Sequence, residues 1–111
     1  MNVDRTLAAL AEPSRRAVIE LLRQRPRRAG ELAAAMGLSG PALSRHLKVL
    51  RSTGLVEVRF VDDDARGRLY RLRPVGLREL QTWIVGVGSF WDTQLAAYQT
   101  HATRRNRGRR R

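Results

Sequence analysis

The sequence of 111 residues contains no cysteine. Without a thiol, the chain can form no disulfide, offers no thiolate ligand to a metal, and has no cysteine nucleophile or thiol-based redox sensor. Long apolar runs are missing too. The uncharged stretch from Leu80 to Trp91 is shorter than the roughly 18 apolar residues that a membrane span needs. The first residues, Met1–Arg5, do not look like a signal peptide. We therefore expect a cytoplasmic protein with no membrane partner.

Acidic residues are few, with 10 Asp and Glu against 22 Lys and Arg, so the net charge is +12. A surplus this large favours a polyanionic partner, most often nucleic acid. Six arginines lie among the last eight residues, and without them residues 1–103 still carry +6. Lys48 is the only lysine. Arginine suits phosphate and guanine contacts, although a G+C-rich genome would give the same bias through codon usage.

The chain has the length of one domain. Apolar periodicity predicts helices over about Val3–Ala11 and over Pro13–Gln24. Residues 103–111 contain no apolar side chain and carry charge of one sign, which predicts a disordered tail. We therefore expect one domain over residues 1–102, followed by this arginine-rich tail.

A helix-turn-helix is the most informative pattern. The segment Ala29–Met36 is predicted to be helical and to end at Gly37, which suits the left-handed position after a helix. Ser39 can cap a second helix over residues 40–53, and Pro41 fits its first turn. A connection this short sets the second helix across the first. Its outward face is then free to enter a DNA major groove.

Two short stretches rich in β-prone residues follow, Leu55–Val61 and Arg68–Leu72, with a turn over residues 62–67. Strand, turn and strand directly after a recognition helix make a wing. The predicted fold is therefore mainly α with a small β-hairpin wing, a winged helix-turn-helix in the order α-α-α-α-β-β-α.

The turn of the wing is acidic at its tip, through Asp62, Asp63 and Asp64. These carboxylates either form a solvated turn, facing away from phosphate or pairing with Arg66 and Arg68, or they make a wing that limits DNA affinity or orients a partner. Both interpretations remain open at this point.

The last helix is predicted from residue 74 to about residue 98. Its apolar residues recur at steps of three and four, and Trp83 and Phe90 add a second apolar face. A helix apolar on two faces cannot bury both against so small a body, so we expect a homodimer. Gly86 and Gly88 either let the partner helix approach closely or mark a kink. The expected dimer interface comprises Leu7, Leu80, Ile84, Val87, Trp91 and Leu95.

Five short motifs stand in order along the chain: LAEPSRR at 10–16, GELA at 30–33, SRHLKVL at 44–50, GLV at 54–56 and FWD at 90–92. Each motif alone is common, but the ordered series resembles the ArsR family of bacterial repressors. The resemblance implies a winged-helix homodimer, paired through its first and last helices. Such dimers bind palindromic operators and release them on a signal.

The resemblance does not extend to metal sensing. Metal-sensing members carry cysteines in or beside the first helix of the helix-turn-helix, where this sequence has alanines at 33–35. Others use Asp and His pairs along the last helix, which here offers only Asp92, with His101 beyond its predicted end. The three or four ligands that hold zinc are missing. We therefore expect no metal and no cofactor; the chain resembles members whose effector is unknown.

The expected DNA contacts lie on the helix 40–53 and in the wing. Ser44 and Arg45 face outward, where Arg45 can read a guanine, whereas Lys48 suits the DNA backbone. Arg15 and Arg16 either contact phosphate or pair with nearby glutamates. The full predicted set is Ser39, Pro41, Ser44, Arg45, His46, Lys48, Arg51, Arg66 and Arg68.

These patterns predict a dimeric, sequence-specific transcriptional regulator that binds double-stranded DNA. The resemblance further implies an autorepressor-like repressor of a palindromic operator. The alternative is a winged-helix module that binds a protein, or nucleic acid without specificity. The sequence shows no paired carboxylates, no nucleophile beside a base and no phosphate loop, so we expect no enzymatic activity.

Overall fold

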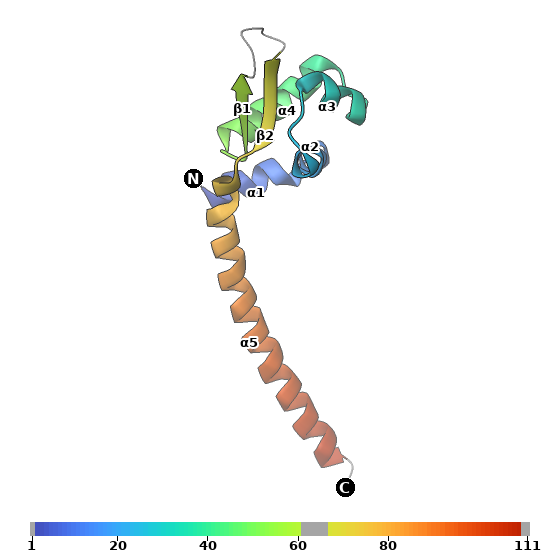
Figure 1. The fold of residues 1–111 in the computed structure, drawn as a ribbon. Coiled ribbons are helices and arrows are strands. Elements are labelled where there is room, and N and C mark those ends of the chain that lie inside the picture. Colours follow the sequence, from blue (N-terminus) through green and yellow to red (C-terminus); the bar gives the residue numbers. More distant parts are fainter. Residues whose placement is uncertain (1, 61–66, 110–111) are drawn as a thin grey trace. The chain divides into compact units, whose positions relative to one another are not determined.

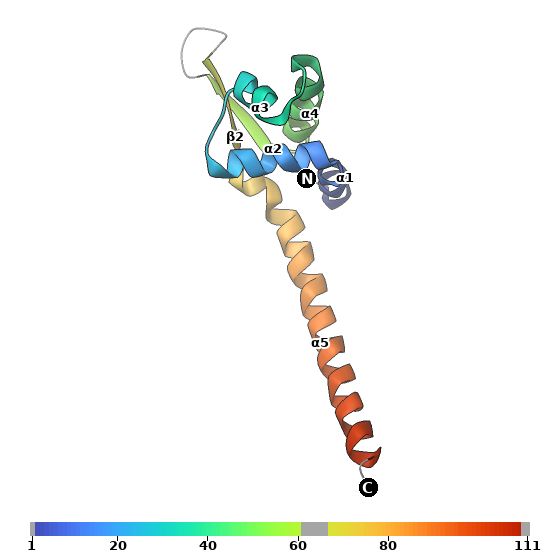
Figure 2. The same ribbon diagram turned by 90° about the vertical axis from the view of Figure 1, so that its right-hand side faces the viewer.

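The computed structural model describes residues 2–60 and 67–109, with side chains described as far as residue 105. The elements follow in the order α1, α2, α3, α4, β1, β2, η2 and α5 (Figures 1 and 2). They divide into two compact units, unit 1 (Met1–Leu80) and unit 2 (Gln81–Arg111). A mainly helical chain with one antiparallel hairpin confirms the predicted fold class. The single domain over residues 1–102 stays a prediction.

The first two helices, α1 (Val3–Ala11) and α2 (Pro13–Gln24), begin and end at the predicted residues. Asn2 caps α1 with its side-chain oxygen 2.8 Å from the backbone nitrogen two residues further on, and Glu12 caps α2 in the same way at 3.1 Å. Pro13 occupies the first turn of α2, where a missing N–H loses no helical hydrogen bond. Local signals therefore set the boundary between these helices.

The helix-turn-helix comprises α3 (Ala29–Met36) and α4 (Gly40–Ser52). α3 ends, as predicted, at Gly37, whose φ of 64° lies in the left-handed region. The hydroxyl of Ser39 accepts a hydrogen bond from the backbone N–H of Ala42 at 3.3 Å, which caps α4 as predicted. α4 ends one residue before the predicted boundary.

A Schellman motif terminates α4. The N–H of Leu55 donates to the carbonyl of Leu50 at 3.0 Å, and the N–H of Gly54 donates to the carbonyl three residues before it at 3.1 Å. The short 3-10 helix η2 (Pro74–Leu77) packs against this turn. A Cβ added at Gly76 would lie 2.1 Å from the carbonyl oxygen of Gly54. Only glycine therefore fits at position 76 without a shift of the backbone.

The wing consists of β1 (Val56–Phe60) and β2 (Arg68–Leu72), which pair antiparallel. Residues 62–66 of the predicted turn, which include its acidic tip, lie outside the described residues. The connector between α2 and α3 joins the sheet through Arg27. Its N–H donates to the carbonyl of Tyr70 at 3.0 Å, and the N–H of Tyr70 donates back at 2.8 Å. This isolated antiparallel bridge places Arg27 beside β2, in the position of a one-residue third strand.

Unit 1 encloses the apolar core, to which every element from α1 to β2 contributes. Tyr70 of β2 closes one side, and the fully buried Leu32 and Leu50 lie at its centre. The other buried side chains of this cluster are Ala9, Val18, Leu22, Leu43, Leu47, Leu55 and Val56.

The last helix, α5 (Arg78–Arg109), is longer than predicted. We expected it to end near residue 98 and residues 103–111 to be disordered, but the helix continues to residue 109. Residues 94–105 contain neither proline nor glycine and are rich in Ala, Gln and Arg, which favour helix. Cations near a helix C-terminus also interact favourably with the helix dipole. These local preferences outweigh the repulsion between like charges on which the prediction relied.

Candidate DNA-binding surface

α4 has one buried face and one exposed face. Leu43, Leu47 and Leu50 are at most 3% exposed, because steps of four and three residues place them on one side of the helix. Arg45 lies on the opposite side of the helix and Ser44 lies between the two faces; both are exposed. Burial of each leucine is worth roughly 1.5–3 kcal/mol. The leucines therefore fix the rotation of α4 about its axis, and this rotation presents Ser44 and Arg45 outward.

The N-terminal end of α4 is exposed at Ser39 and Pro41. Backbone N–H groups in the first turn of a helix have no helical partners and attract phosphate. The hydroxyl of Ser39 already accepts the capping hydrogen bond from Ala42. The structure thus gives Ser39 a capping role, and a phosphate contact at this end stays a prediction.

His46 does not share the exposed face of Ser44 and Arg45. It is half-buried and contributes to the electrostatic environment of Glu12 at the start of α2. The pKa of Glu12 is lowered, chiefly by the hydrogen bond from the backbone N–H of Ser14, with a smaller contribution from His46. His46 is therefore placed towards α2, and its predicted contact with DNA is untested.

Lys48 and Arg51 line an open groove of about 530 Å³ between the C-terminal half of α4 and β1. Arg73, just after β2, adds a third cation to this groove. The one carboxylate of the lining, Glu57, forms a salt bridge with Arg71 on the facing strand. The groove is therefore basic. Arg73 was missed by the sequence analysis, although a basic residue directly after a wing strand was a usable signal.

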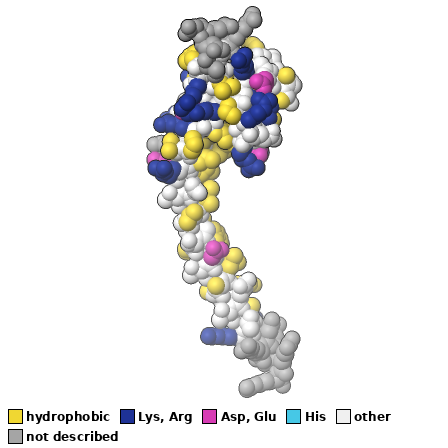
Figure 3. Space-filling model, viewed as in Figure 1, with side chains coloured by type: hydrophobic (Ala, Val, Ile, Leu, Met, Phe, Trp, Pro, Cys, Tyr) yellow, Lys and Arg dark blue, Asp and Glu magenta, His cyan; other side chains and the backbone are white. Residues whose placement is uncertain are grey.

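The end of the wing next to the turn holds Arg68, an exposed residue whose guanidinium lies 5.6 Å from the centre of the Phe60 ring. This cation–π contact joins the two strands. Arg66, the other predicted wing contact, lies outside the described residues. In the view of Figure 3, Lys and Arg side chains gather over unit 1, which carries the helix-turn-helix and the wing.

Comparison with known proteins identifies the family. A model described as "Bacterial regulatory protein, arsR family" matches residues 12–58, from the start of α2 into β1. The HTH-type transcriptional regulator Rv2034 of Mycobacterium tuberculosis is 41% identical over 97 residues, which make up 86% of this chain and 83% of the relative. The chain belongs to the ArsR family.

Two further proteins resemble this ArsR-family chain. The transcriptional repressor SdpR of Bacillus subtilis is 26% identical, over 78% of this chain and 93% of the relative. The homodimeric winged helix-turn-helix DNA-binding domain of Mb0332 from Mycobacterium bovis superposes with a TM-score of 0.61 at 31% identity, covering 78% of each chain. The chain is thus a DNA-binding transcription regulator with a winged helix-turn-helix, as predicted, in a family of regulators rather than enzymes.

In this ArsR-family regulator, large apolar side chains of α5 are exposed. Ile84, Trp91 and Leu95 are each more than half exposed, and Leu7 on α1 is 41% exposed. Apolar side chains follow α5 in Figure 3. Leu80, the remaining large member of the predicted dimer interface, is only 6% exposed within the single chain and lies in unit 1. It is therefore not available to a second chain in this conformation.

Arg15 and Arg16 both donate hydrogen bonds to α1. This arrangement matches neither of the two expected alternatives, contact with phosphate or pairing with nearby glutamates. Arg15 donates from Nε to the carbonyl of Ala9 at 2.6 Å, and Arg16 donates to the carbonyls of Leu10 and Ala11 at 2.8 and 3.0 Å. These carbonyls end α1 and have no helical partners of their own. The two arginines therefore cap α1 and hold the corner between α1 and α2.

Among residues 2–60 and 67–109, no group of three or more His, Cys, Asp or Glu side chains is placed to hold a metal ion. Within the same part of the chain, no helix is both long and apolar enough to cross a membrane.

Proposed function

We propose that this ArsR-family chain is a dimeric repressor that inserts α4 into the major groove of a palindromic operator. The observation that carries the proposal is the exposed surface of α4, where Arg45 stands opposite three buried leucines and Ser44 is exposed beside it. A guanidinium in this position can span O6 and N7 of guanine, and the neighbouring Lys48 suits phosphate. Such a regulator acts on chromosomal DNA in the bacterial cytoplasm.

A homodimer accounts for the exposed apolar side chains of α5. Water contact at Ile84, Trp91 and Leu95 is unfavourable, and a second α5 with the same apolar residues can remove it. The resemblance to the domain of Mb0332, named as homodimeric, supports this assignment. A two-fold dimer presents two copies of α4, which match a palindrome with half-sites about one helical turn apart.

Repression is supported by the similarity to a protein named as a repressor, SdpR. A dimer bound to a promoter prevents other proteins from binding the same DNA, because it occupies their site. We propose that the operator lies upstream of the chain's own gene, where a footprint would locate it.

Replacing Arg45 tests the mode of DNA recognition. Arg45→Ala should cost roughly 1–3 kcal/mol on the operator and much less on random DNA, so the ratio of the two affinities falls. Arg23→Ala is the matched control, because Arg23 is exposed on α2 and, among the described residues, forms an ion pair with Glu20 alone, at 3.7 Å. The measurement is fluorescence anisotropy on both DNAs over a series of salt concentrations. Equal weakening on both DNAs would instead support a winged-helix module that binds nucleic acid without specificity.

Removing residues 104–111 tests the role of the terminal arginines. A cationic segment that meets only phosphate should strengthen binding to operator and random DNA by similar factors. Its removal should leave the affinity ratio nearly intact. It should also flatten the salt dependence by about 0.9 in log K against log salt for each lost phosphate contact. Loss of discrimination on truncation would show that this segment reads the DNA.

A further inference from the structure

Two open grooves of unit 1 meet at the C-terminal end of α4. The groove between α4 and β1 measures about 530 Å³, and a second groove of about 250 Å³ lies between the end of α4 and the start of α1. Four residues line both grooves: Arg51, Ser52, Gly54 and Arg73. A continuous hollowed surface therefore runs from β1 past the end of α4 to α1.

Four cations lie along this hollowed surface. Lys48 and Arg51 come from α4, Arg73 follows β2, and Arg5 comes from α1. All four residues are exposed, and none of them forms an ion pair with a carboxylate of the part of the chain that the structure describes. The one carboxylate in the described lining belongs to the cross-strand salt bridge of the wing. These four cations, the basic surface, thus keep their charge for a partner outside unit 1.

The turn after α4 fixes the backbone of two of these cations. The N–H of Arg73 donates to the carbonyl of Leu55 at 3.0 Å, and the carbonyl of Arg73 accepts from the N–H of Gly76 at 2.9 Å. The carbonyl of Arg51 accepts from the N–H of Gly54 at 3.1 Å. A backbone that is ordered before binding loses little entropy on binding. The basic surface is therefore prepared for an anionic partner.

Lys48 connects the basic surface with the predicted recognition residue Arg45. Three residues of an α-helix fall about 60° short of a full turn. Arg45, Lys48 and Arg51 therefore form a slanting row around α4. The row begins on the side opposite the buried leucines and ends at the groove beside β1.

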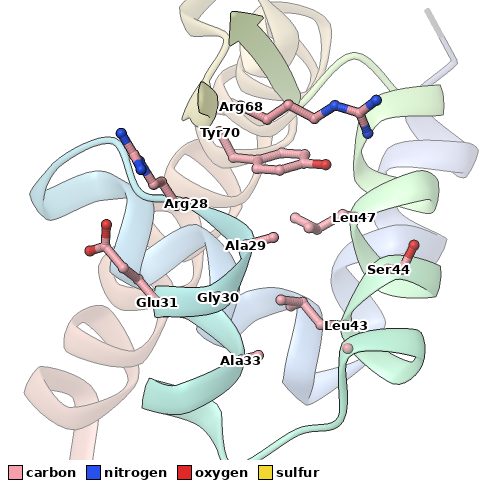
Figure 4. A pocket seen from close by; sticks show the side chains of 11 residues that line it. Arg28, Ala29, Gly30, Glu31, Ala33, Leu43, Ser44, Leu47, Arg68 and Tyr70 are labelled. Atoms are coloured by element: carbon pink, nitrogen blue, oxygen red, sulfur yellow. The ribbon is translucent and has the colours of Figure 1, made fainter. Parts of the chain in front are cut away.

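Towards α3 and β2, by contrast, core side chains cover α4. Figure 4 shows Leu43, Leu47 and Tyr70 between these elements, and each of them is at most 8% exposed. Arg68 lies above the Tyr70 ring in this view, with its guanidinium directed towards α4. The interior is occupied by the core here, so an anion can contact only the rim, where Arg68 lies.

We propose that the basic surface binds the phosphates of the DNA strand that borders the major groove occupied by α4, an inference that rests on the proposed function. The major groove is about 12 Å wide, and a helix with its side chains measures about 10–12 Å across. The bordering strand must therefore run directly beside α4. With Arg45 at the bases, the slanting row of cations leads to this strand.

Arg5 extends this contact to α1 without using the predicted dimer interface. Residues two apart on a helix lie about 200° apart around its axis. Arg5 and Leu7 therefore lie on nearly opposite sides of α1, and the fully buried Thr6 lies between them in the sequence. One side of α1 can thus contact a second chain while the other contacts DNA.

Salt dependence on random DNA tests the basic surface without requiring an operator. Arg5→Gln, Arg51→Gln and Arg73→Gln should each flatten log K against log salt by about 0.9 for each lost phosphate contact. Each lost contact should thus lower the ratio of the affinities at about 50 and 200 mM salt by about threefold. Arg23→Gln removes the same charge from an exposed position on α2 and should change neither quantity. Slopes equal to that of this control in all three variants would overturn the proposal.

A charge-conserving variant separates phosphate contact from a role in the fold. Arg73→Lys should keep the wild-type slope, because an ammonium also binds phosphate as a point charge. Thermal denaturation should give the same stability for Arg73→Lys, Arg73→Gln and the wild type. If the lysine variant loses as much slope as the glutamine variant, Arg73 does not act through its charge, which contradicts the proposal.

Pyrophosphate distinguishes the DNA backbone from a free phosphate ligand. Calorimetric titration of the full chain with pyrophosphate should show no saturable binding at micromolar concentrations. Saturable binding that Arg73→Gln removes, together with an unchanged salt slope on DNA, would assign the basic surface to a free anion instead.

Comparison of operator with random DNA separates this inference from the proposed function. The variants of the basic surface should weaken binding to both DNAs by similar factors, because phosphate contacts carry no direct sequence information. A wild type without preference for the operator would remove the repressor proposal and keep the basic surface. Unchanged salt slopes with an intact preference would do the reverse.

Discussion

Unit 1 and α5 both carry apolar residues at helical spacing, yet they differ in what covers them. In unit 1, Leu32 and Leu50 are fully buried by neighbouring elements of the same chain. On α5, Leu95 is 53% exposed and Trp91 is 58% exposed. Periodicity therefore determines which face of a helix is apolar, whereas the surface that covers this face depends on the rest of the assembly. Unit 1 buries its apolar residues within one chain, whereas the exposed apolar side chains of α5 are the basis of the proposed dimer.

The largest effect is expected from a charge placed on the apolar surface of α5. Trp91→Glu should convert the dimer to a monomer, because a carboxylate buried in an apolar interface without a partner is strongly unfavourable. Sedimentation at high salt, which suppresses association driven by arginine, should show the chain mass of 12.6 kDa for the variant and twice that mass for the wild type. Gln94→Glu, at an exposed polar position of the same helix, is the control. A folded wild-type monomer at micromolar concentration would refute the dimer.

Replacing one leucine by alanine in each region tests the difference in burial between unit 1 and α5. Leu50→Ala should lower the free energy of unfolding by about 2–5 kcal/mol, because it removes a fully buried side chain. Leu95→Ala should leave the unfolding of the monomer nearly unchanged and should act on the dimer, so its effect should grow with protein concentration. Urea denaturation at two protein concentrations measures both. Equal losses at low concentration would mean that Leu95 is buried within its own chain.

Replacing one glycine by alanine in each region tests how closely the backbone is packed in unit 1 and on α5. Gly76→Ala should destabilise unit 1 by about 1–3 kcal/mol, since the new Cβ meets the carbonyl oxygen of Gly54. Gly86→Ala meets no atom within 4 Å and should stabilise α5 by up to about 1 kcal/mol. Thermal denaturation measures both the expected loss of stability in Gly76→Ala and the expected gain in Gly86→Ala. A loss of dimer in Gly86→Ala would show that the partner helix approaches closely at this glycine.

A smaller effect is expected at the corner between α1 and α2. Arg15→Ala should lower stability by about 1 kcal/mol, because it removes the side-chain hydrogen bond to the carbonyl of Ala9. Faster amide exchange in α1 would locate the loss. Arg23→Ala, an exposed position on the same helix, should change stability by less. If Arg15→Ala weakens DNA binding without loss of stability, this arginine contacts phosphate instead.

No effect at all is expected from metals. Zinc, arsenite or a chelator should leave the affinity for DNA unchanged, because the described residues hold no cluster of metal ligands and the chain has no cysteine. The same anisotropy assay measures this. A tenfold change with stoichiometric metal, about 1.4 kcal/mol, would reveal a site that neither sequence nor structure indicates.

The boundaries of the first helices were predictable because their signals are local. Ser39 caps α4 and Gly37 ends α3 through hydrogen bonds that reach no further than five residues along the chain. The inward leucines and the outward Arg45 follow from the same short-range geometry. The buried and exposed faces of α4 could therefore be predicted without knowledge of the tertiary structure.

Other features depend on partners that are distant in sequence or absent from it. Arg15 has a long side chain with several possible partners, and only the packing of α2 against α1 places it on the carbonyls of α1. Leu80 follows the periodicity of α5, but its burial depends on the body of unit 1. The end of α5 carries no glycine cap or proline near residue 98, so no local signal marked its length. The basic surface draws its cations from separate elements and has no sequence pattern of its own.

The bridge between Arg27 and Tyr70 limits how the chain can be lengthened. The connector that contains Arg27 is short, polar and at the surface, and such segments normally tolerate insertions. Here both backbone groups of Arg27 are engaged by β2, at 3.0 and 2.8 Å. An inserted residue just before or after it would pull α2 or α3 out of register with the wing. Tags and reporter domains inserted at this connector should therefore compromise folding, even though the side chains there point largely to solvent.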